Sequence, residues 1–98
     1  MLSSKQRGYL SRLASAMDPV LMIGKDGVSD GVEDAFSREL HFRELMKVRF
    51  QASKDERFDL AAALAEKYQA ELVRVIGNTA IFYKKSDDPE HRNIELPS

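Results

Sequence analysis

The chain has 98 residues, of which 43% are hydrophobic and 32% charged, and it contains no cysteine. This length and composition favour one folded domain with a modest core, and they exclude disulfides, thiol nucleophiles and thiolate metal sites within the chain. The formal net charge of -1 is unevenly spread, because residues 1–85 hold 14 Lys and Arg against 12 Asp and Glu, while residues 86–98 hold one against four.

The first part of the chain predicts a helix followed by a strand. Ser3 and Gln6 have the spacing of a capping box, and apolar residues then recur at helical intervals, which predicts a helix from about Ser4 to Met17. Pro19 cannot continue this helix. The apolar run from Val20 to Ile23 therefore predicts a short buried strand.

The middle of the chain predicts a second helix and a strand with one basic face. Ser29 is a typical N-cap residue, and the acidic residues that follow it suit the positive end of a helix dipole. Between Leu45 and Phe50 the apolar period changes from helical spacing to two. Lys47 and Arg49 then share the strand face opposite the apolar residues, so we expect that outer face to be basic.

The remaining elements complete an α/β order. An alanine-rich helix is predicted from about Asp55 to Tyr68, and strands from Leu72 to Ile76 and from Thr79 to Tyr83 flank a hairpin turn at Gly77-Asn78. The expected order is α-β-α-β-α-β-β. We therefore predict a single compact α/β domain whose four-stranded mixed sheet is packed by helices on at least one face.

The predicted domain spans residues 1–85, and residues 86–98 form an acidic tail. The tail lacks apolar periodicity and only Ile94 and Leu96 could dock, so we expect a mostly flexible segment. No apolar run approaches the roughly 20 residues of a membrane span, and the residues after Met1 do not resemble a signal peptide. We therefore expect a cytoplasmic protein without membrane contact.

The segment Gly24-Lys25-Asp26-Gly27 is the first candidate site. It connects a predicted strand to a predicted helix, so its glycines let a ligand approach the backbone while the helix N-terminus adds free N–H donors. GXXG loops of KH-type RNA binders clamp nucleotide backbones in this way. Two glycines three residues apart also occur in plain turns. Because Asp26 offsets the charge of Lys25, such a loop must rely on shape and backbone donors.

Two groups of cations could support the loop. Lys5 and Arg12 fall on one flank of the first predicted helix at about 100° per residue. Lys47, Arg49 and Arg74 form a second group if their strands are neighbours with these side chains on one face. A solvated surface position is the simpler interpretation of each single cation, so clustering is the test. We interpret four other cationic residues as ordinary surface partners of acids such as Glu39, Glu44, Glu56 and Glu66. These four residues are Arg38, Arg43, Arg57 and Lys67.

Catalytic and metal chemistry have no visible pattern. His41 and His91 have no further ligands at metal spacing, and nucleophile-elbow, zinc-protease and phosphate-loop motifs are missing from the sequence. We therefore expect no enzymatic activity, no cofactor, no bound metal and no small-molecule substrate. Aromatic residues at helical spacing are expected to pack in the core rather than stack on bases, namely Tyr9, Phe58 and Tyr68. Tyr83 fits either a core position or a partly wet edge.

A set of short stretches stands in a characteristic order, namely Ser4-Lys5-Gln6-Arg7, Leu10, Leu13-Ala14, Asp18-Pro19, Ile23 to Val28, Glu44 to Val48 and Glu71 to Gly77. Together they resemble the bacterial YhbY family, which is the stand-alone CRM domain. The resemblance runs from about Leu2 to Lys85, and Ile94 to Pro97 also resembles the usual ending of the family.

The resemblance implies a fold similar to the C-terminal domain of translation initiation factor three. It also implies RNA binding without catalysis, with ribosomal RNA in large-subunit precursors as the partner. We expect the protein itself to be a monomer. The implied RNA-binding residues are Gly24, Lys25, Asp26 and Gly27 with Lys5, Arg12 and Lys47, and further Arg7 and Arg74. Asn78 departs from the family pattern, which often has a basic residue after the Ile-Gly of the hairpin.

Two functions remain open from the sequence. The first is a backbone-binding RNA protein acting in assembly of the large ribosomal subunit. The second is a protein-interaction module that binds ribosomal or assembly proteins without direct RNA contact, through the basic strand face or the acidic tail. Affinity that falls steeply with salt supports the first, whereas association that survives complete RNA digestion supports the second.

Overall fold

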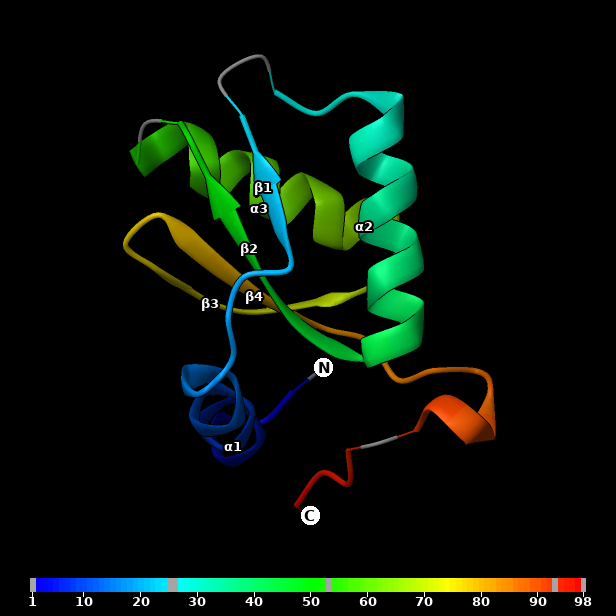
Figure 1. Cartoon of the computed structure of the whole chain (residues 1–98). Helices are drawn as coiled ribbons and strands as arrows, with labels where there is room; N and C mark the ends of the chain where they lie inside the picture. The colour runs from blue at the N-terminus through cyan, green and yellow to red at the C-terminus, as the bar shows by residue number, and fades with distance from the viewer. Residues whose placement is uncertain (1, 25–26, 53, 93, 98) are drawn as a thin grey trace.

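The computed structural model describes residues 2–24, 27–52, 54–92 and 94–97. In chain order its elements are α1 (Ser4–Ser15), β1 (Leu21–Ile23), α2 (Asp30–Arg43), β2 (Leu45–Phe50), α3 (Lys54–Lys67), β3 (Glu71–Ile76), β4 (Thr79–Tyr83) and a 3-10 turn, η1 (Pro89–His91) (Figure 1). The predicted order of helices and strands is confirmed. The strands form one four-stranded sheet in the order β1-β2-β4-β3, and this sheet is mixed, as predicted.

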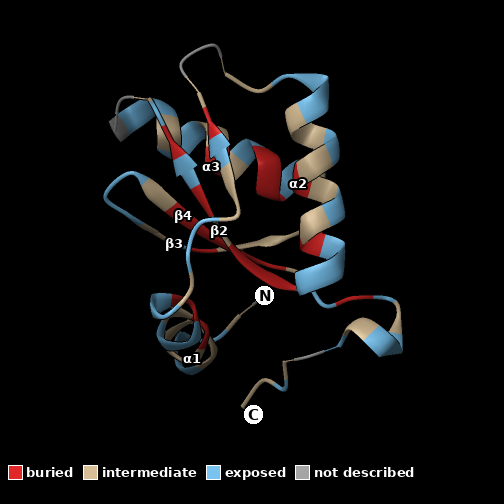
Figure 2. Cartoon of the chain, viewed as in Figure 1, coloured by how far each residue is buried: buried red, intermediate tan, exposed pale blue. Residues whose placement is uncertain are grey.

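Helices pack against both faces of this sheet. β1 runs parallel to β2, and β4 runs antiparallel to β2 and β3. On one face α2 and α3 cover the largest cluster of buried side chains, which includes Phe36, Met46, Val48, Phe50 and Phe82. On the other face α1 covers a smaller cluster that includes Leu10, Ala14, Leu45, Ile81 and Tyr83 (Figure 2).

α1 begins as predicted and ends two residues early. The capping box is present, because the Ser3 side chain accepts from the Gln6 backbone and the Gln6 side chain accepts from the Ser3 backbone. The last turn tightens, since the Met17 N–H donates to the Ala14 carbonyl three residues back. Pro19 then favours an extended conformation at Asp18 and leads the chain into β1.

β2 begins and ends at the predicted residues. Met46, Val48 and Phe50 are buried on the side of α2 and α3. Leu45, Lys47 and Arg49 alternate with them and point to the side of α1, as the period of two predicts. Leu45 is buried beneath α1, so only the later part of β2 presents a basic face.

α3 buries a narrower stripe than its sequence predicts. Ala61, Leu64 and Ala65 are buried and Tyr68 packs against them, but Phe58 is 55% exposed. Phe58 lies at the margin of the stripe in the first part of the helix, so its predicted core position is wrong. Tyr83 takes the core alternative, and burial, together with the negative charge of Glu44, raises the pKa of its phenol.

Glu33 joins α2 to α3. Its carboxylate accepts from the Tyr68 hydroxyl at 2.7 Å and pairs with the Lys67 ammonium at 2.5 Å. The hydrogen bonds from Lys67 and Tyr68 lower the pKa of Glu33. Lys67 thus pairs with an acid of another helix, where the sequence suggested its neighbour Glu66. Arg43, in contrast, pairs with Glu39 one turn away, as expected.

The described part of the tail packs against the domain. Ile94 and Leu96 contact the cluster beneath α1, and the Gln6 side-chain amide donates to the Pro97 carbonyl at 3.0 Å. These are the two apolar residues that the sequence offers as anchors, while the flexibility of the segment stays a prediction. Glu44 is buried and its carboxylate accepts from the N–H of Ser86 at the start of the tail, so its interpretation as an ordinary surface acid is wrong. Within the described ranges, the helices are all too short and too polar to cross a bilayer.

Candidate nucleic-acid interface

The glycine-bounded loop closes immediately after β1. The Gly27 N–H donates to the Gly24 carbonyl at 3.1 Å, and Gly27 has a φ of +84°. This left-handed conformation favours glycine, because a side chain would be strained there. A Cβ at Gly27 would meet no atom within 4 Å, so the backbone is open to a close approach. Lys25 and Asp26, the two predicted contact residues between the glycines, lie outside the described residues.

α2 begins just beyond this loop. The Ser29 hydroxyl accepts from the Val32 N–H at 3.3 Å, and the earlier N–H groups of a helix have no acceptor within the helix itself. Asp30 and Glu33 occupy the first turn, which weakens the attraction of this helix end for an anion. Lys67 offsets the charge of Glu33 through their ion pair. Backbone N–H donors are thus available beside the loop, but acidic side chains partly cancel the positive potential of this helix end.

The sheet places Lys47 and Arg74 on the same face. Lys47 of β2 and Arg74 of β3 are both register partners of Ile81 in β4, one from each side. The two cations are therefore two strand spacings apart, roughly 10 Å. Arg49 points to the same face two residues further along β2, where it is the register partner of Thr79. The three side chains share one face, as the second basic group required, but their strands are not neighbours, because β4 lies between β2 and β3.

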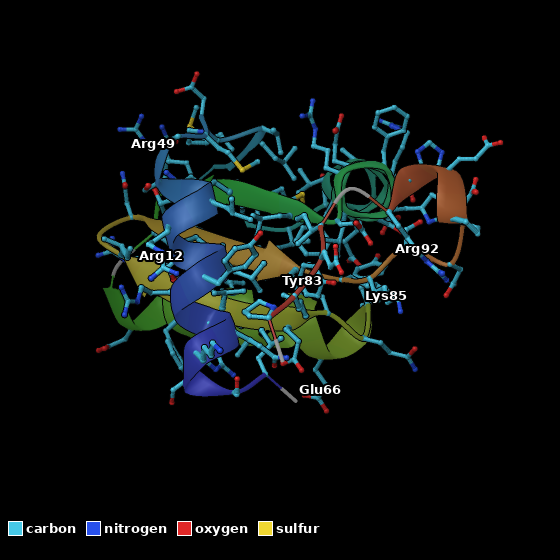
Figure 3. All side chains as sticks on the ribbon, turned by 90° about the horizontal axis from the view of Figure 1, so that it is seen from below. Arg12, Arg49, Glu66, Tyr83, Lys85 and Arg92 are labelled. Atoms are coloured by element: carbon cyan, nitrogen blue, oxygen red, sulfur yellow. The ribbon has the colours of Figure 1, made fainter. Side chains whose placement is uncertain are left out.

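Lys5 and Arg12 lie on the outward face of α1. Both are exposed, whereas Leu10 and Ala14 are the buried residues of this helix. Seven residues separate the two cations, which corresponds to about 10 Å along the helix axis. Gly8 lies between them, and a Cβ there would meet no atom within 4 Å. Figure 3 shows Arg12 and Arg49 toward the same side of the molecule, which is also the side of the β3–β4 turn.

Arg7 is engaged within the fold. Its guanidinium donates to the Leu72 carbonyl at 2.7 Å and to the Val73 carbonyl at 3.1 Å. These carbonyls lie at the irregularity of β3, where the register with β4 shifts between Leu72 and Arg74. The contact fastens α1 to the edge strand of the sheet. Among the proposed cations, Arg7 is thus turned toward the protein while Lys5, Arg12 and Arg74 are exposed.

Three segments meet at the end of the sheet that carries the loop. The Gln51 N–H donates to the Ile23 carbonyl at 2.8 Å, and the Phe50 N–H donates to the Asn78 carbonyl at 2.8 Å. These bonds hold the end of β2 between the start of the loop and the β3–β4 turn. Arg57 of α3 supports the same turn by donating to the Gly77 carbonyl at 2.6 Å, so it serves the turn rather than a surface acid.

Sequence reasoning placed Arg49 in the second basic group but did not select Met22 for this surface. Met22 and Arg49 are register partners, both are exposed, and together with residues 19–21 they line a shallow hollow of about 310 Å³. The period-two pattern indicated the face of Arg49, whereas Met22 belongs to the run predicted as a buried strand, so that prediction is wrong for Met22. Across the described ranges, His and acidic side chains form no group suited to a metal ion.

Comparison with known proteins adds a consistent set of likenesses. A model of the CRS1/YhbY (CRM) domain matches residues 2–84. A Bacillus subtilis protein, named Probable RNA-binding protein YqeI, is 38% identical over 98 residues, which cover 99% of this chain and 100% of that protein. A Haemophilus influenzae protein, named RNA-binding protein, is 32% identical over 97 residues, which cover 98% of this chain and 95% of that protein.

A solved structure is also similar over the full length. The solution structure of a hypothetical protein from Staphylococcus aureus, described as a candidate RNA binding protein, gives a TM-score of 0.84. It is 39% identical in sequence, and the match covers 99% of this chain and 100% of that chain. The arrangement of α1, the sheet and the two other helices is therefore shared with a chain of close sequence.

Proposed function

Because the chain belongs to the CRS1/YhbY (CRM) domain family, we propose that it binds RNA and catalyses no reaction. The observation that carries the proposal is the register of the sheet, in which Lys47 and Arg74 flank Ile81 on one face. The Gly24 to Gly27 loop begins at the end of this sheet where β2 meets the β3–β4 turn, and its backbone at Gly27 is open to a ligand. Cations and open backbone together suit a sugar-phosphate strand.

The proposed contact uses point charges and backbone donors in separate roles. Lys47, Arg74 and Arg12 neutralise phosphates, and release of counterions from the RNA drives binding. The loop and the start of α2 supply N–H groups, which fix the strand by shape rather than by charge. Lys25 and Lys5 extend the cationic surface, and Asp26 limits its strength. Arg7 belongs to the proposed set through the support it gives to α1.

We further propose that the RNA is ribosomal RNA in precursors of the large subunit and that the protein acts as a monomer in the cytoplasm. The support for this choice is the resemblance of the chain to the stand-alone CRM domain. A single small domain with cations on one face of its sheet suits a local structural element of a folded RNA.

Salt dependence tests the phosphate contacts. If about four phosphates are contacted, the logarithm of the affinity falls with the logarithm of salt concentration with a slope of about -2.8 to -3.6. A rise from 50 to 200 mM salt then weakens binding about 50- to 150-fold. Arg74→Glu should weaken binding to a large-subunit RNA transcript severalfold, and Arg38→Glu, an exposed residue of α2, is the matched control. Affinity that ignores both salt and Arg74→Glu contradicts the proposal.

A protein interface is the second candidate, and a specific apolar hollow favours it. Leu13 and Met17 of the α1 end, Phe42 of α2, and Ile94 of the tail help to line a depression of about 410 Å³, and Phe42 is 58% exposed. Complete ribonuclease digestion separates the candidates. Association with ribosomal precursors that survives digestion, and that Phe42→Ser abolishes, supports the protein interface.

A further inference from the structure

One row of side chains crosses all four strands on the face that carries α1. The register aligns Met22 of β1 with Arg49 of β2, Arg49 with Thr79 of β4, and Thr79 with Ile76 of β3. We refer to these four residues as the open row. It spans three strand spacings, roughly 14 Å.

α1 leaves the open row uncovered. Leu10 and Ala14 of α1 pack on Leu45, Val73, Ile81 and Tyr83, which lie toward the other end of the sheet face. Met22 is 53% exposed and Ile76 is 55% exposed, and Arg49 is also exposed. Figure 3 shows Arg49 and the β3–β4 turn to one side of α1, outside the surface that the helix covers. Two large apolar side chains thus stand in solvent on a sheet that is packed elsewhere.

The open row begins at the glycine-bounded loop. Met22 is two residues before Gly24, and the Gln51 N–H bond to the Ile23 carbonyl fixes the end of β1 beside β2. The row ends at Ile76, directly before the β3–β4 turn. The open row therefore lies directly beside the loop.

The surroundings of the open row are cationic. Arg49 belongs to the row, and the adjacent row across the sheet consists of Lys47, Ile81 and Arg74. Neither row contains an acidic residue. This combination of exposed apolar groups and cations complements a ligand that is flat and apolar on one part and anionic on another.

We propose that the open row receives unpaired nucleobases of the same RNA strand whose phosphates contact the loop and the cations, an inference that rests on the proposed function. In a double helix the base faces are stacked on each other, and only the grooves and the phosphates are accessible. In a single strand the faces are free and stack on aromatic side chains and on Arg guanidinium planes. Arg49 supplies such a plane, and Met22 and Ile76 supply apolar contact on either side of it.

The charge of the surface favours nucleotides over an apolar protein segment. A hydrophobic peptide would bury Met22 and Ile76 but would leave Arg49, Lys47 and Arg74 without counter-charges. A nucleotide strand offers a base for the apolar side chains and a phosphate for each cation. The substrate class is therefore single-stranded or looped RNA, with paired RNA as the weaker ligand.

Three RNA probes of one length separate base contact from phosphate contact in the full chain. They are an unstructured oligoadenylate, an abasic strand with the same number of phosphates, and a fully paired duplex. The variant is the double substitution Met22→Ser with Ile76→Ser, which changes exposed residues. Phe42→Ser, which removes an equally exposed apolar side chain far from the row, is the matched control.

We expect the double variant to bind oligoadenylate about tenfold more weakly than the unchanged chain, because it loses two aliphatic contacts while Arg49 keeps its stacking plane, and the loss of a full aromatic stack costs roughly tenfold or more per base. Its affinity for the abasic strand and the duplex should stay within about twofold, as should every affinity of Phe42→Ser. Met22→Leu should retain the binding of oligoadenylate. Circular dichroism checks that each variant is folded.

The outcomes distinguish the inference from the proposed function. Equal affinity of the unchanged chain for oligoadenylate and the abasic strand, or a double variant with unaltered binding, overturns the inference alone. Equal weakening on all three probes also overturns it. If the unchanged chain binds none of the probes and no large-subunit RNA, the proposed function itself fails. Loss of a ribonuclease-resistant protein partner in the double variant assigns the row to a protein instead.

Discussion

The buried carboxylate of Glu44 accepts the backbone N–H of Ser86 at 2.7 Å, across a separation of 42 residues. Its second oxygen accepts from the Ile94 N–H at 3.2 Å, and its own carbonyl accepts from the Lys84 N–H. Glu44 stands between α2 and β2 with a φ of +66°, a left-handed conformation that is uncommon outside glycine. Glu44 thus joins the end of α2 to the start of β2 and fixes the path of the tail.

Glu44→Gln should destabilise the protein and loosen the tail. The amide keeps one acceptor oxygen, so one of the two tail N–H groups loses its acceptor in a buried place, at a cost of about 1 to 3 kcal/mol. Chemical denaturation measures the free energy of unfolding, and hydrogen exchange at Ser86 and Ile94 measures the tail. Glu39→Gln, in a partly exposed pair with Arg43, should change stability by less than about 1 kcal/mol. Unaltered exchange at both amides would show that Glu44 does not hold the tail.

Arg7→Met should lower the stability of the fold, whereas Arg12→Met should weaken RNA binding, although both residues belong to α1. Arg7 donates two hydrogen bonds to backbone carbonyls, so its loss should lower the free energy of unfolding by about 1.5 to 3 kcal/mol. Arg12 is exposed, and its loss should change stability by no more than about 0.5 kcal/mol. In RNA binding below the unfolding temperature, Arg12→Met should be severalfold weaker and Arg7→Met close to unchanged. The reverse ranking in affinity would make Arg7 a direct RNA contact.

Gly27→Ala should be less stable than Gly24→Ala. The φ of +84° at Gly27 is strained for any side chain, with a cost of about 1 to 2 kcal/mol. A Cβ at Gly24 would meet the Gln51 side chain at 3.8 Å, an ordinary contact, so this change should cost less than about 0.5 kcal/mol. Thermal unfolding of the two variants measures the difference. Equal melting temperatures would mean that the loop readily adopts another conformation.

Glu33 should make the stability depend on pH in the acid range. Its pKa is lowered in the folded protein by the hydrogen bonds from Lys67 and Tyr68, so the unfolded chain takes up its proton first as the pH falls. The stabilisation is present above the ordinary pKa of a glutamate and is lost as the pH falls through the lowered value. Chemical denaturation at several pH values between neutral pH and pH 3 measures this effect. The free energy of unfolding should fall more steeply with pH for the unchanged chain than for Glu33→Gln.

Salt provides the control for this pH effect. Lys67 is largely exposed, with 62% of its side chain accessible, so its charge is screened by added ions. The difference in steepness between the unchanged chain and Glu33→Gln should shrink at high ionic strength. An acid-range slope that is identical in the two proteins would show that the pair with Lys67 does not contribute to folding stability.

Local patterns were sufficient for most of the secondary structure. β2 begins and ends at the residues that the period of two predicted, because alternation in a strand reflects two unlike faces, and β4 begins and ends at the residues predicted beside the hairpin turn at Gly77-Asn78. The capping box at Ser3 and the N-cap at Ser29 were also predicted, since a cap depends on residues within one turn of each other. The order of the elements and the candidate loop between β1 and α2 follow from the same local rules.

Some of the predictions that failed concern groups that meet from distant parts of the chain. Glu44 looked like a surface acid beside Arg43, yet it is buried because the tail brings two backbone N–H groups to it. Lys67 has an acid beside it in sequence, but it pairs with Glu33 of another helix. Neither partner can be found from spacing, because the contact exists only when two elements pack.

The sequence by itself determined the elements, their amphipathic faces and the candidate loop, because these depend on residue spacing of two, three or four. Only the tertiary structure decided which cations share a surface, through the pairing of β2 and β3 with β4 that brings Lys47 and Arg74 to either side of Ile81. It also decided that α1 covers one part of the sheet face and leaves Met22 and Ile76 exposed. Strand order and helix placement depend on long-range packing, which leaves no periodic signal along the chain.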